Sequence, residues 1–179
     1  SYDANGDATV GGTKYRRMKA GDATYHDAGG YSDHYNWKDT STYHYFKYQP
    51  IKWRVLNRNG NDALLLADVA LDDQKYNTNG EDVTWESSSM RSWLNGYGAS
   101  VNQPKTDYSR KNFIDSAFTS TQKNAIKTTN VVNNNNIDYG TAGGNNTSDK
   151  VFLLSESEVY NTDMAEGYGF VKEIGRAHV

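Results

Sequence analysis

The chain contains no cysteine, which excludes disulfide bonds, thiolate metal sites and cysteine nucleophiles. It also has no excess of positive charge. The net charge is −3 at pH 7 and the isoelectric point is near 5.8, so there is no broad positive field to attract nucleic acid. No segment approaches the apolar length that spans a bilayer. We therefore expect no nucleic-acid partner and no membrane span, while the lack of cysteine does not exclude secretion.

Motifs for catalysis are absent as well. There is no Gly-x-Ser-x-Gly sequence for a hydrolase nucleophile, and the four histidines have no spacing typical of a zinc site. Two adjacent carboxylate pairs, Asp72-Asp73 and Glu81-Asp82, are of the type that serves glycosidases as acid and base. Such pairs are more often solvated loop residues. We predict that the chain is not an enzyme, with no catalytic residues.

Calcium is the one metal that the composition favours. Asp72-Asp73 with Asn77, and the segment 133–149, supply the carboxylate and amide oxygens that a hard cation prefers. Asn and Asp are equally favoured in turns because they bond their own backbone, and no EF-hand spacing occurs. We predict no metal site and no cofactor, and leave calcium as an open alternative.

Aromatic residues are plentiful at 13%, with 14 Tyr and 4 Trp, although the mean hydropathy is only −0.88. A disordered chain is poor in aromatics, so this composition indicates a folded protein with a polar, loop-rich surface. The length of 179 residues fits one domain. An aromatic cluster at 34–46 has two interpretations, cover for a sheet edge or a stacking surface for sugar rings.

The strongest strand signal lies in residues 48–67. Apolar residues alternate from Ile51 to Val55, Asn59-Gly60 marks a turn, and Ala63 to Ala67 is a short apolar run. This pattern predicts a β-hairpin with one half-exposed and one buried strand, which would form the sheet against which later helices pack.

Capping signals place short helices after this hairpin. Ser87 to Ser89 precede Met90, Trp93 and Leu94 at helical spacing, and Asn95-Gly96 ends the helix. Capping boxes at 119–122 and 155–158 open two more helices, and another is expected over 109–117. Further strands are expected at 13–18, 126–132 and 151–154, the last of them buried, with a long surface loop over 133–146. The sequence predicts an α+β fold with an antiparallel sheet.

Several of these motifs, taken in order, resemble the bacterial DUF6273 family. They are Pro50 to Leu56, Leu64 to Leu66, Tyr76-Asn77, Trp85 with Ser88, Met90 to Asn95, Thr147 to Asp149 and Val151 to Glu156. The resemblance covers about residues 43–160. It implies a fold similar to the C-type-lectin-like fold of the formylglycine-generating enzymes, and a place in secreted, multidomain surface proteins of Gram-positive gut bacteria. The cysteines that those enzymes need are absent.

The resemblance also sets expectations about organisation. We expect a single domain over 1–179, with an aromatic and Gly-rich N-terminal segment (1–47), the family core (48–160) and, over 161–179, the start of a C-terminal part that is missing. The family's later strands are not found here, so we expect the natural protein to continue past Val179 or another chain to complete the fold. The start at Ser1, without Met, indicates a trimmed or processed N-terminus.

Three functional hypotheses follow. The first is a non-catalytic extracellular module that binds a glycan or a protein through loops over a rigid sheet. The others are a carbohydrate- or protein-modifying enzyme with part of its site in the missing region, and a structural spacer beside other domains of a larger surface protein. The candidate contact residues of the first hypothesis are Trp37, Tyr43, Tyr45, Tyr76, Trp85, Tyr97 and Tyr139, and of the tryptophans Trp85 and Trp93 are the most suited to the core instead.

Overall fold

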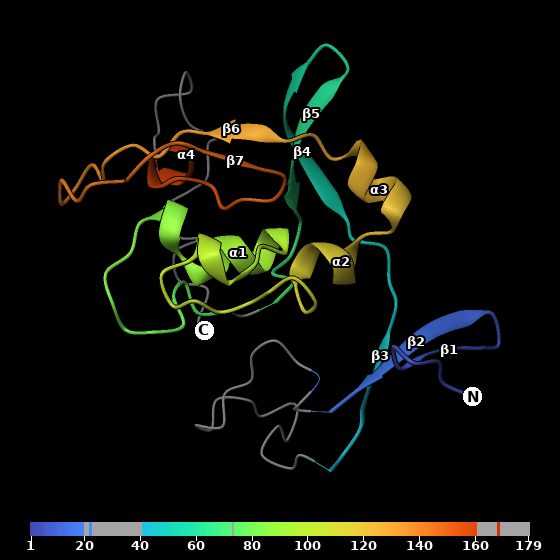
Figure 1. Ribbon diagram of the computed structural model, residues 1–179. Coiled ribbons are helices and arrows are strands. Elements are labelled where there is room, and N and C mark those ends of the chain that lie inside the picture. The colour runs from blue at the N-terminus through green and yellow to red at the C-terminus, as the bar shows by residue number, and fades with distance from the viewer. Residues whose placement is uncertain (20–21, 23–40, 73, 161–167, 169–179) are drawn as a thin grey trace. The chain divides into compact units, whose positions relative to one another are not determined.

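The computed structural model describes residues 1–19, 22, 41–72, 74–160 and 168 (Figure 1). The chain divides into two compact units, Ser1–Asp73 and Gln74–Val179. Among the described residues, the first unit contains two small antiparallel sheets, and the second contains one such sheet together with short helices. The predicted α+β class is therefore confirmed. The predicted aromatic cluster up to residue 40, including Trp37, and the expected C-terminal part at 161–167 and 169–179 lie outside the described residues.

The first unit begins with a three-stranded antiparallel sheet. Its strands are β1 (Asp7–Val10), β2 (Thr13–Met18) and β3 (His44–Lys47), in the order β1-β2-β3. The turn between β1 and β2 uses Gly11 and Gly12, both at positive φ, where residues with a side chain are strained. The strand expected at 13–18 is confirmed.

The hairpin of the first unit consists of β4 (Trp53–Asn59) and β5 (Asp62–Ala67), with a bulge between Val55 and Asn57. The turn lies at Gly60-Asn61, one residue later than expected, with Gly60 at φ +59°. The expectation that β5 is buried is wrong, because Leu65 is 46% exposed and Leu64 and Leu66 are only half-buried. A two-stranded ribbon without a third strand leaves its outer face open to solvent.

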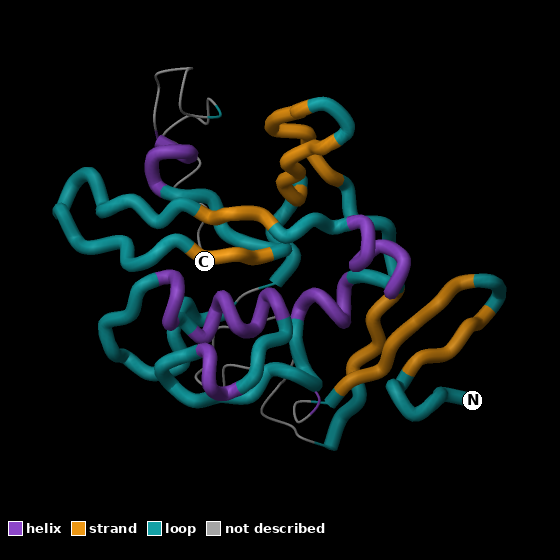
Figure 2. The backbone as a smooth tube through the Cα atoms, turned by 45° about the horizontal axis from the view of Figure 1, so that its top comes forward, coloured by secondary structure: helices purple, strands orange, loops and turns teal. Residues whose placement is uncertain are grey.

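The second unit holds the helices and a third sheet. Its elements in chain order are η2 (Trp85–Ser87), α1 (Ser89–Asn95), η3 (Ala99–Val101), α2 (Phe113–Ala117), α3 (Ser120–Ala125), β6 (Thr129–Val131), β7 (Thr147–Asp149) and α4 (Glu156–Tyr160). Strands β6 and β7 pair antiparallel. Much of the described chain between these elements is loop (Figure 2).

The hydrophobic core belongs to this second unit. Trp85, Trp93, Leu94 and Tyr108 form the buried cluster. Half-buried apolar side chains pack against it, namely Met90, Phe113, Val131, Val151 and Phe152. The prediction that the hairpin forms the core is therefore wrong, because no residue of β4 or β5 belongs to this cluster. Two tryptophans on and beside a short helix bury more apolar area than the aliphatic side chains of an open ribbon.

The three predicted capping sites are confirmed. The hydroxyl of Ser88 accepts from the N–H of Arg91, and Gly96 ends α1 at φ +72°. Thr119 and Gln122 form a complete capping box at α3. At α4, Ser155 N–H donates to the Glu158 carboxylate and Glu158 N–H donates to the Ser155 hydroxyl.

Three predicted elements are corrected. Helix α2 starts at Phe113 rather than 109, because Asn112 has extended φ and caps the helix by accepting the N–H of Asp115. Residues 151–154 are not a strand, and Leu153 is 46% exposed. The Val151 N–H and carbonyl bond the side chain of Asn95 instead of a neighbouring strand. The strand expected at 126–132 is shorter, at 129–131.

Candidate functional site

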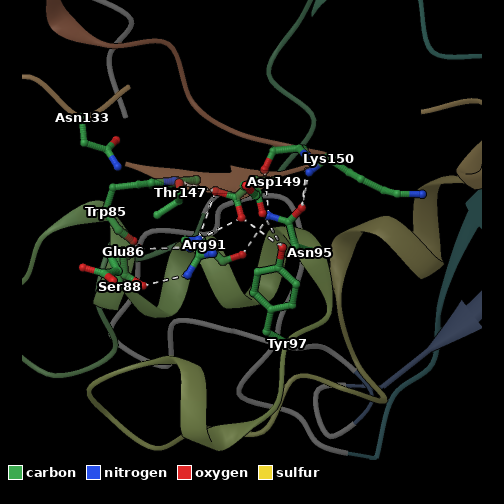
Figure 3. A network of polar contacts seen from close by, with 12 residues as sticks. Trp85, Glu86, Ser88, Arg91, Asn95, Tyr97, Asn133, Thr147, Asp149 and Lys150 are labelled. Carbon is green, nitrogen blue, oxygen red and sulfur yellow. Dashed lines mark hydrogen bonds and ion pairs between the residues drawn. The ribbon is translucent and has the colours of Figure 1, made fainter. Parts of the chain in front are cut away.

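A fully buried carboxylate, Asp149, is the centre of the polar network in the second unit (Figure 3). It lies at the end of β7 and faces helix α1. Its oxygens accept hydrogen bonds from Trp85 Nε1 at 3.0 Å, Arg91 Nε at 2.9 Å, the Tyr97 hydroxyl at 3.0 Å and the Thr147 hydroxyl at 2.7 Å. An ionised carboxylate offers about four lone-pair positions, and four different donors fill them.

Arg91 supplies the positive charge that compensates this carboxylate. Its side chain is 12% exposed, and Asp149 is 0% exposed. The guanidinium also donates to the Glu86 carbonyl at 3.0 Å and lies over the Tyr97 ring at 5.0 Å. Each of these contacts restrains the planar group. The ion pair is therefore held in one geometry by groups before and after α1.

Asn95 connects the same helix to the segment after β7. It lies one turn beyond Arg91, so the two side chains share a face of α1. The Asn95 amide oxygen accepts the N–H groups of Lys150 and Val151, each at 3.0 Å, and its nitrogen donates to the Val151 carbonyl at 2.8 Å. Helix α1 thus fixes the chain on both sides of residue 150.

Tyr97 completes the network at its outer edge. Its hydroxyl donates to Asp149 and lies 3.2 Å from the Ser148 carbonyl. Burial of the phenol and the adjacent negative charge of Asp149 raise the pKa of Tyr97 to about 12. The phenol therefore stays neutral and remains a donor at neutral pH.

Asp149 has no acceptor position left for a substrate. The pairing of Asp149 with four protein donors matches a structural ion pair rather than an acid or base. What it positions is the loop 132–146, which joins β6 to β7 (Figure 1). The loop leads directly into Thr147, whose hydroxyl donates to Asp149. This loop is the exposed part of the candidate site.

The loop is internally bonded and closed at its base. Asn133 N–H donates to the Asn146 side chain at 3.0 Å, and the Asn133 amide donates to the Asn145 carbonyl at 2.7 Å. At the tip, the Asn136 side-chain oxygen accepts the N–H of Asp138 at 3.0 Å and of Tyr139 at 2.7 Å. These bonds form a turn that presents Tyr139 with 85% of its surface exposed.

Comparison with known families gives one result. The family described as Domain of unknown function (DUF6273) matches residues 60–174. The chain belongs to the DUF6273 family. No curated protein and no solved structure matches the chain significantly.

Several of the motifs that carry the resemblance to DUF6273 build the buried network. Arg91 and Asn95 come from Met90 to Asn95, and Asp149 comes from Thr147 to Asp149, with Trp85 and Ser88 alongside. Sequence reasoning did not predict that Arg91 and Asp149 pair. An Arg within an apolar helix stripe, and a lone Asp beside an apolar run, are the signals that point to a buried partner.

The residues predicted to contact a ligand do not all gather in one place. Tyr43 and Tyr45 lie on and beside β3 in the first unit, with Tyr45 59% exposed. In the second unit Trp85 is 8% exposed and bonded to Asp149, so it belongs to the core, as does Trp93. Tyr76 is 44% exposed and Tyr97 is half-buried in the network, which leaves Tyr139 as the most exposed. Trp37 lies outside the described residues.

The candidate acids and metal ligands are dispersed. Within the described part of the chain, no group of three or more His, Cys, Asp or Glu could hold a metal ion. Glu81 and Asp82 are exposed, and Glu81 accepts a hydrogen bond from Gln103. Asp73 lies outside the described residues. In the region described, no helix has the length and apolar character needed to cross a membrane.

Proposed function

We propose that this DUF6273 chain is a non-catalytic recognition module of a bacterial surface protein, which binds a glycan through the loop 132–146. The observation that carries the proposal is Tyr139, 85% exposed on a turn that Asn136 holds closed. An exposed aromatic ring on an ordered backbone can stack on the apolar face of a sugar ring. Side-chain amides and a carboxylate beside it offer donors and acceptors for sugar hydroxyls.

Pre-ordering of the loop supports this role. A ligand that binds a loop already held by internal bonds does not have to supply the free energy for ordering it. The bonds at 133, 136 and 145–146 hold the loop, and the ion pair between Arg91 and Asp149 anchors the strand into which it continues. The function is thus assigned to a surface loop on a rigid support.

We propose in addition a C-type-lectin-like arrangement and a secreted or cell-surface location for the module. Small antiparallel sheets, short capped helices and long loops support the first. Membership of DUF6273 supports the second through the resemblance described above. Secretion of a reporter fusion expressed with its natural leader sequence would test the location.

A glycan array probed with the full chain tests the proposed function. We expect binding to at least one glycan, strongly weakened by Tyr139→Ala and retained by Tyr139→Phe, which keeps the ring. The control variant is Asn124→Ala, which changes an exposed residue on α3 and should bind as the unchanged chain does. Binding to none of the glycans, or equal binding by Tyr139→Ala, contradicts the proposal. Binding to host proteins alone would reassign the loop to protein recognition.

A further inference from the structure

The sheet β1-β2-β3 of the first unit has two faces with different charge balance. On one face, Lys14 and Arg16 both pair with the Asp7 carboxylate, at 2.8 and 2.7 Å. The Tyr48 hydroxyl lies 3.2 Å from the same carboxylate. The cations of this face are therefore already bound within the sheet.

On the opposite face, the cations have no carboxylate partner among the described residues. Strand residues point alternately to the two faces, so Arg17 lies opposite the face of Lys14 and Arg16. Strand pairing places Arg17 beside Tyr45 and Lys47 beside Tyr15 on this second face. Among the described residues, no ion pair involves Arg17, Lys19 or Lys47, and Asp22 accepts only the backbone N–H of Lys19.

Tyrosine rings separate these cations. The Arg17 guanidinium lies 4.5 Å from the ring centres of both Tyr2 and Tyr43, and Lys19 Nζ lies 4.7 Å from that of Tyr43. The Tyr2 and Tyr45 ring centres are 6.1 Å apart. Cation–π contacts of this kind hold a charge in place without neutralising it. We name this surface the tyrosine–cation face, formed by Tyr2, Tyr15, Arg17, Lys19, Tyr43, Tyr45 and Lys47.

We propose that the tyrosine–cation face binds an anionic polysaccharide, with a carboxylate or sulfate on its repeating units. Lys47 lies two residues, about 6.7 Å along β3, from Tyr45, which is the cross-strand partner of Arg17, so the two cations are spaced at the scale of a sugar polymer. Tyr45, 59% exposed, offers an open ring to the apolar side of a sugar while neighbouring cations bind its acidic group. This site lies outside residues 60–174, which match DUF6273, and does not depend on the proposed loop site.

A sugar polymer fits this face better than a nucleic acid. Binding of single-stranded nucleic acid uses several open aromatic rings on which successive bases stack. Of the four tyrosines here only Tyr45 is exposed, and Tyr2, Tyr15 and Tyr43 are half-buried.

Two matched pairs of polysaccharides test the proposal with the full chain. Polygalacturonate and its fully methyl-esterified form differ in the carboxylate, and dextran sulfate and dextran differ in the sulfate. We expect affinity electrophoresis to show binding to one charged polymer and not to its neutral counterpart, weakening as salt rises. The pair of polymers whose charged member binds shows whether the face recognises a carboxylate or a sulfate. Failure of both charged polymers to bind overturns the proposal.

Charge variants locate the binding. Arg17→Gln and Lys47→Gln should each weaken binding about fivefold, the effect of one cation near an anionic surface. Lys47 is exposed and can be changed without disturbing the packing. The control, Arg58→Gln, removes an exposed cation from β4 with the same change in net charge and should have little effect. Equal weakening by all three contradicts a local site.

The tyrosine–cation face and the loop 132–146 should bind their ligands independently. Tyr139→Ala should leave polysaccharide binding unchanged, and Arg17→Gln should leave binding through the loop unchanged, so either site can fail alone. The face should also prefer a sugar polymer to other polyanions. Oligo(dT) or poly-glutamate bound as tightly as the charged polysaccharides would overturn the assignment to a sugar polymer.

Discussion

Arg91 and Asp149 are 58 residues apart in the sequence and form an ion pair in which the carboxylate is completely buried. The pair joins helix α1 to the end of β7. Removal of one partner from such a pair leaves a buried charge uncompensated, which costs more than the loss of an exposed pair.

Asp149→Asn should lower the free energy of unfolding by about 3–5 kcal/mol, because Arg91 then keeps its charge in a buried position. Urea denaturation followed by tryptophan fluorescence measures this, since Trp85 lies in the network. The control is Lys123→Gln, which removes a partly exposed pair with Asp115 in the same unit and should cost about 1 kcal/mol or less. Similar losses for both variants would contradict a network held by the buried charge.

Tyr97 should make the fold sensitive to alkali. Its pKa is raised from 10.0 to about 12, so the folded state favours the neutral phenol. This contribution to stability is complete below pH 10 and is lost as the pH rises to about 12. Tyr97→Phe cannot ionise, and its stability relative to the unchanged chain should improve across that interval. Parallel stability curves for the two proteins from pH 9 to 12 would refute the assignment.

Gly96 should tolerate a side chain less well than Gly140. It has φ +72°, and a Cβ there would lie 2.9 Å from Nδ2 of Asn112, which caps α2. Gly140, at φ +67°, has nothing within 4 Å of the same position. Gly140→Ala should lower the free energy of unfolding by about 1–2 kcal/mol because of the backbone conformation alone. Gly96→Ala should lower it by about 1 kcal/mol or more in addition, because of the contact with Asn112. Thermal unfolding of the two variants measures this difference. Equal losses of stability would mean that the Asn112 side chain moves aside freely.

Asp7 should make the first sheet sensitive to acid. The Arg16 guanidinium, followed by Lys14, lowers the pKa of Asp7 from 3.8 to about 2, against the opposing effect of burial. The folded state therefore favours the ionised form, and this stability is present above pH 3.8 and lost as the pH falls to about 2. Asp7→Asn should show less acid sensitivity in that interval, measured by far-ultraviolet circular dichroism. An identical acid transition in both proteins would contradict the role of this carboxylate.

The local structure of this fold is predicted well from the sequence. Ser88, Thr119 and Ser155 cap helices where their spacing to later residues indicates, because a cap depends on atoms a few residues apart. The exposed loop 133–146 is also confirmed by the exposure of Ile137 and Tyr139. The order of the motifs indicates family membership, and the match over 60–174 confirms it.

Long-range relationships were not predictable from one sequence. The apolar run at 63–67 looks buried by composition, but burial depends on what covers a strand, and β5 is left partly exposed. Segment 151–154 looks like a strand, but Asn95, more than fifty residues earlier, bonds its backbone. The single domain, the ligand contacts and the surface location remain predictions.

Both ends of the loop 132–146 are held by residues outside the loop. Val131, before the loop, packs on the core, and Asp149, after it, binds α1. Residues 137–142 at the tip take no part in this anchoring. The tip can therefore change in sequence or length without altering the packing beneath it. Exchange of a few residues at the tip therefore changes the exposed surface and leaves the packing intact, and the same scaffold can serve as a carrier for foreign loops.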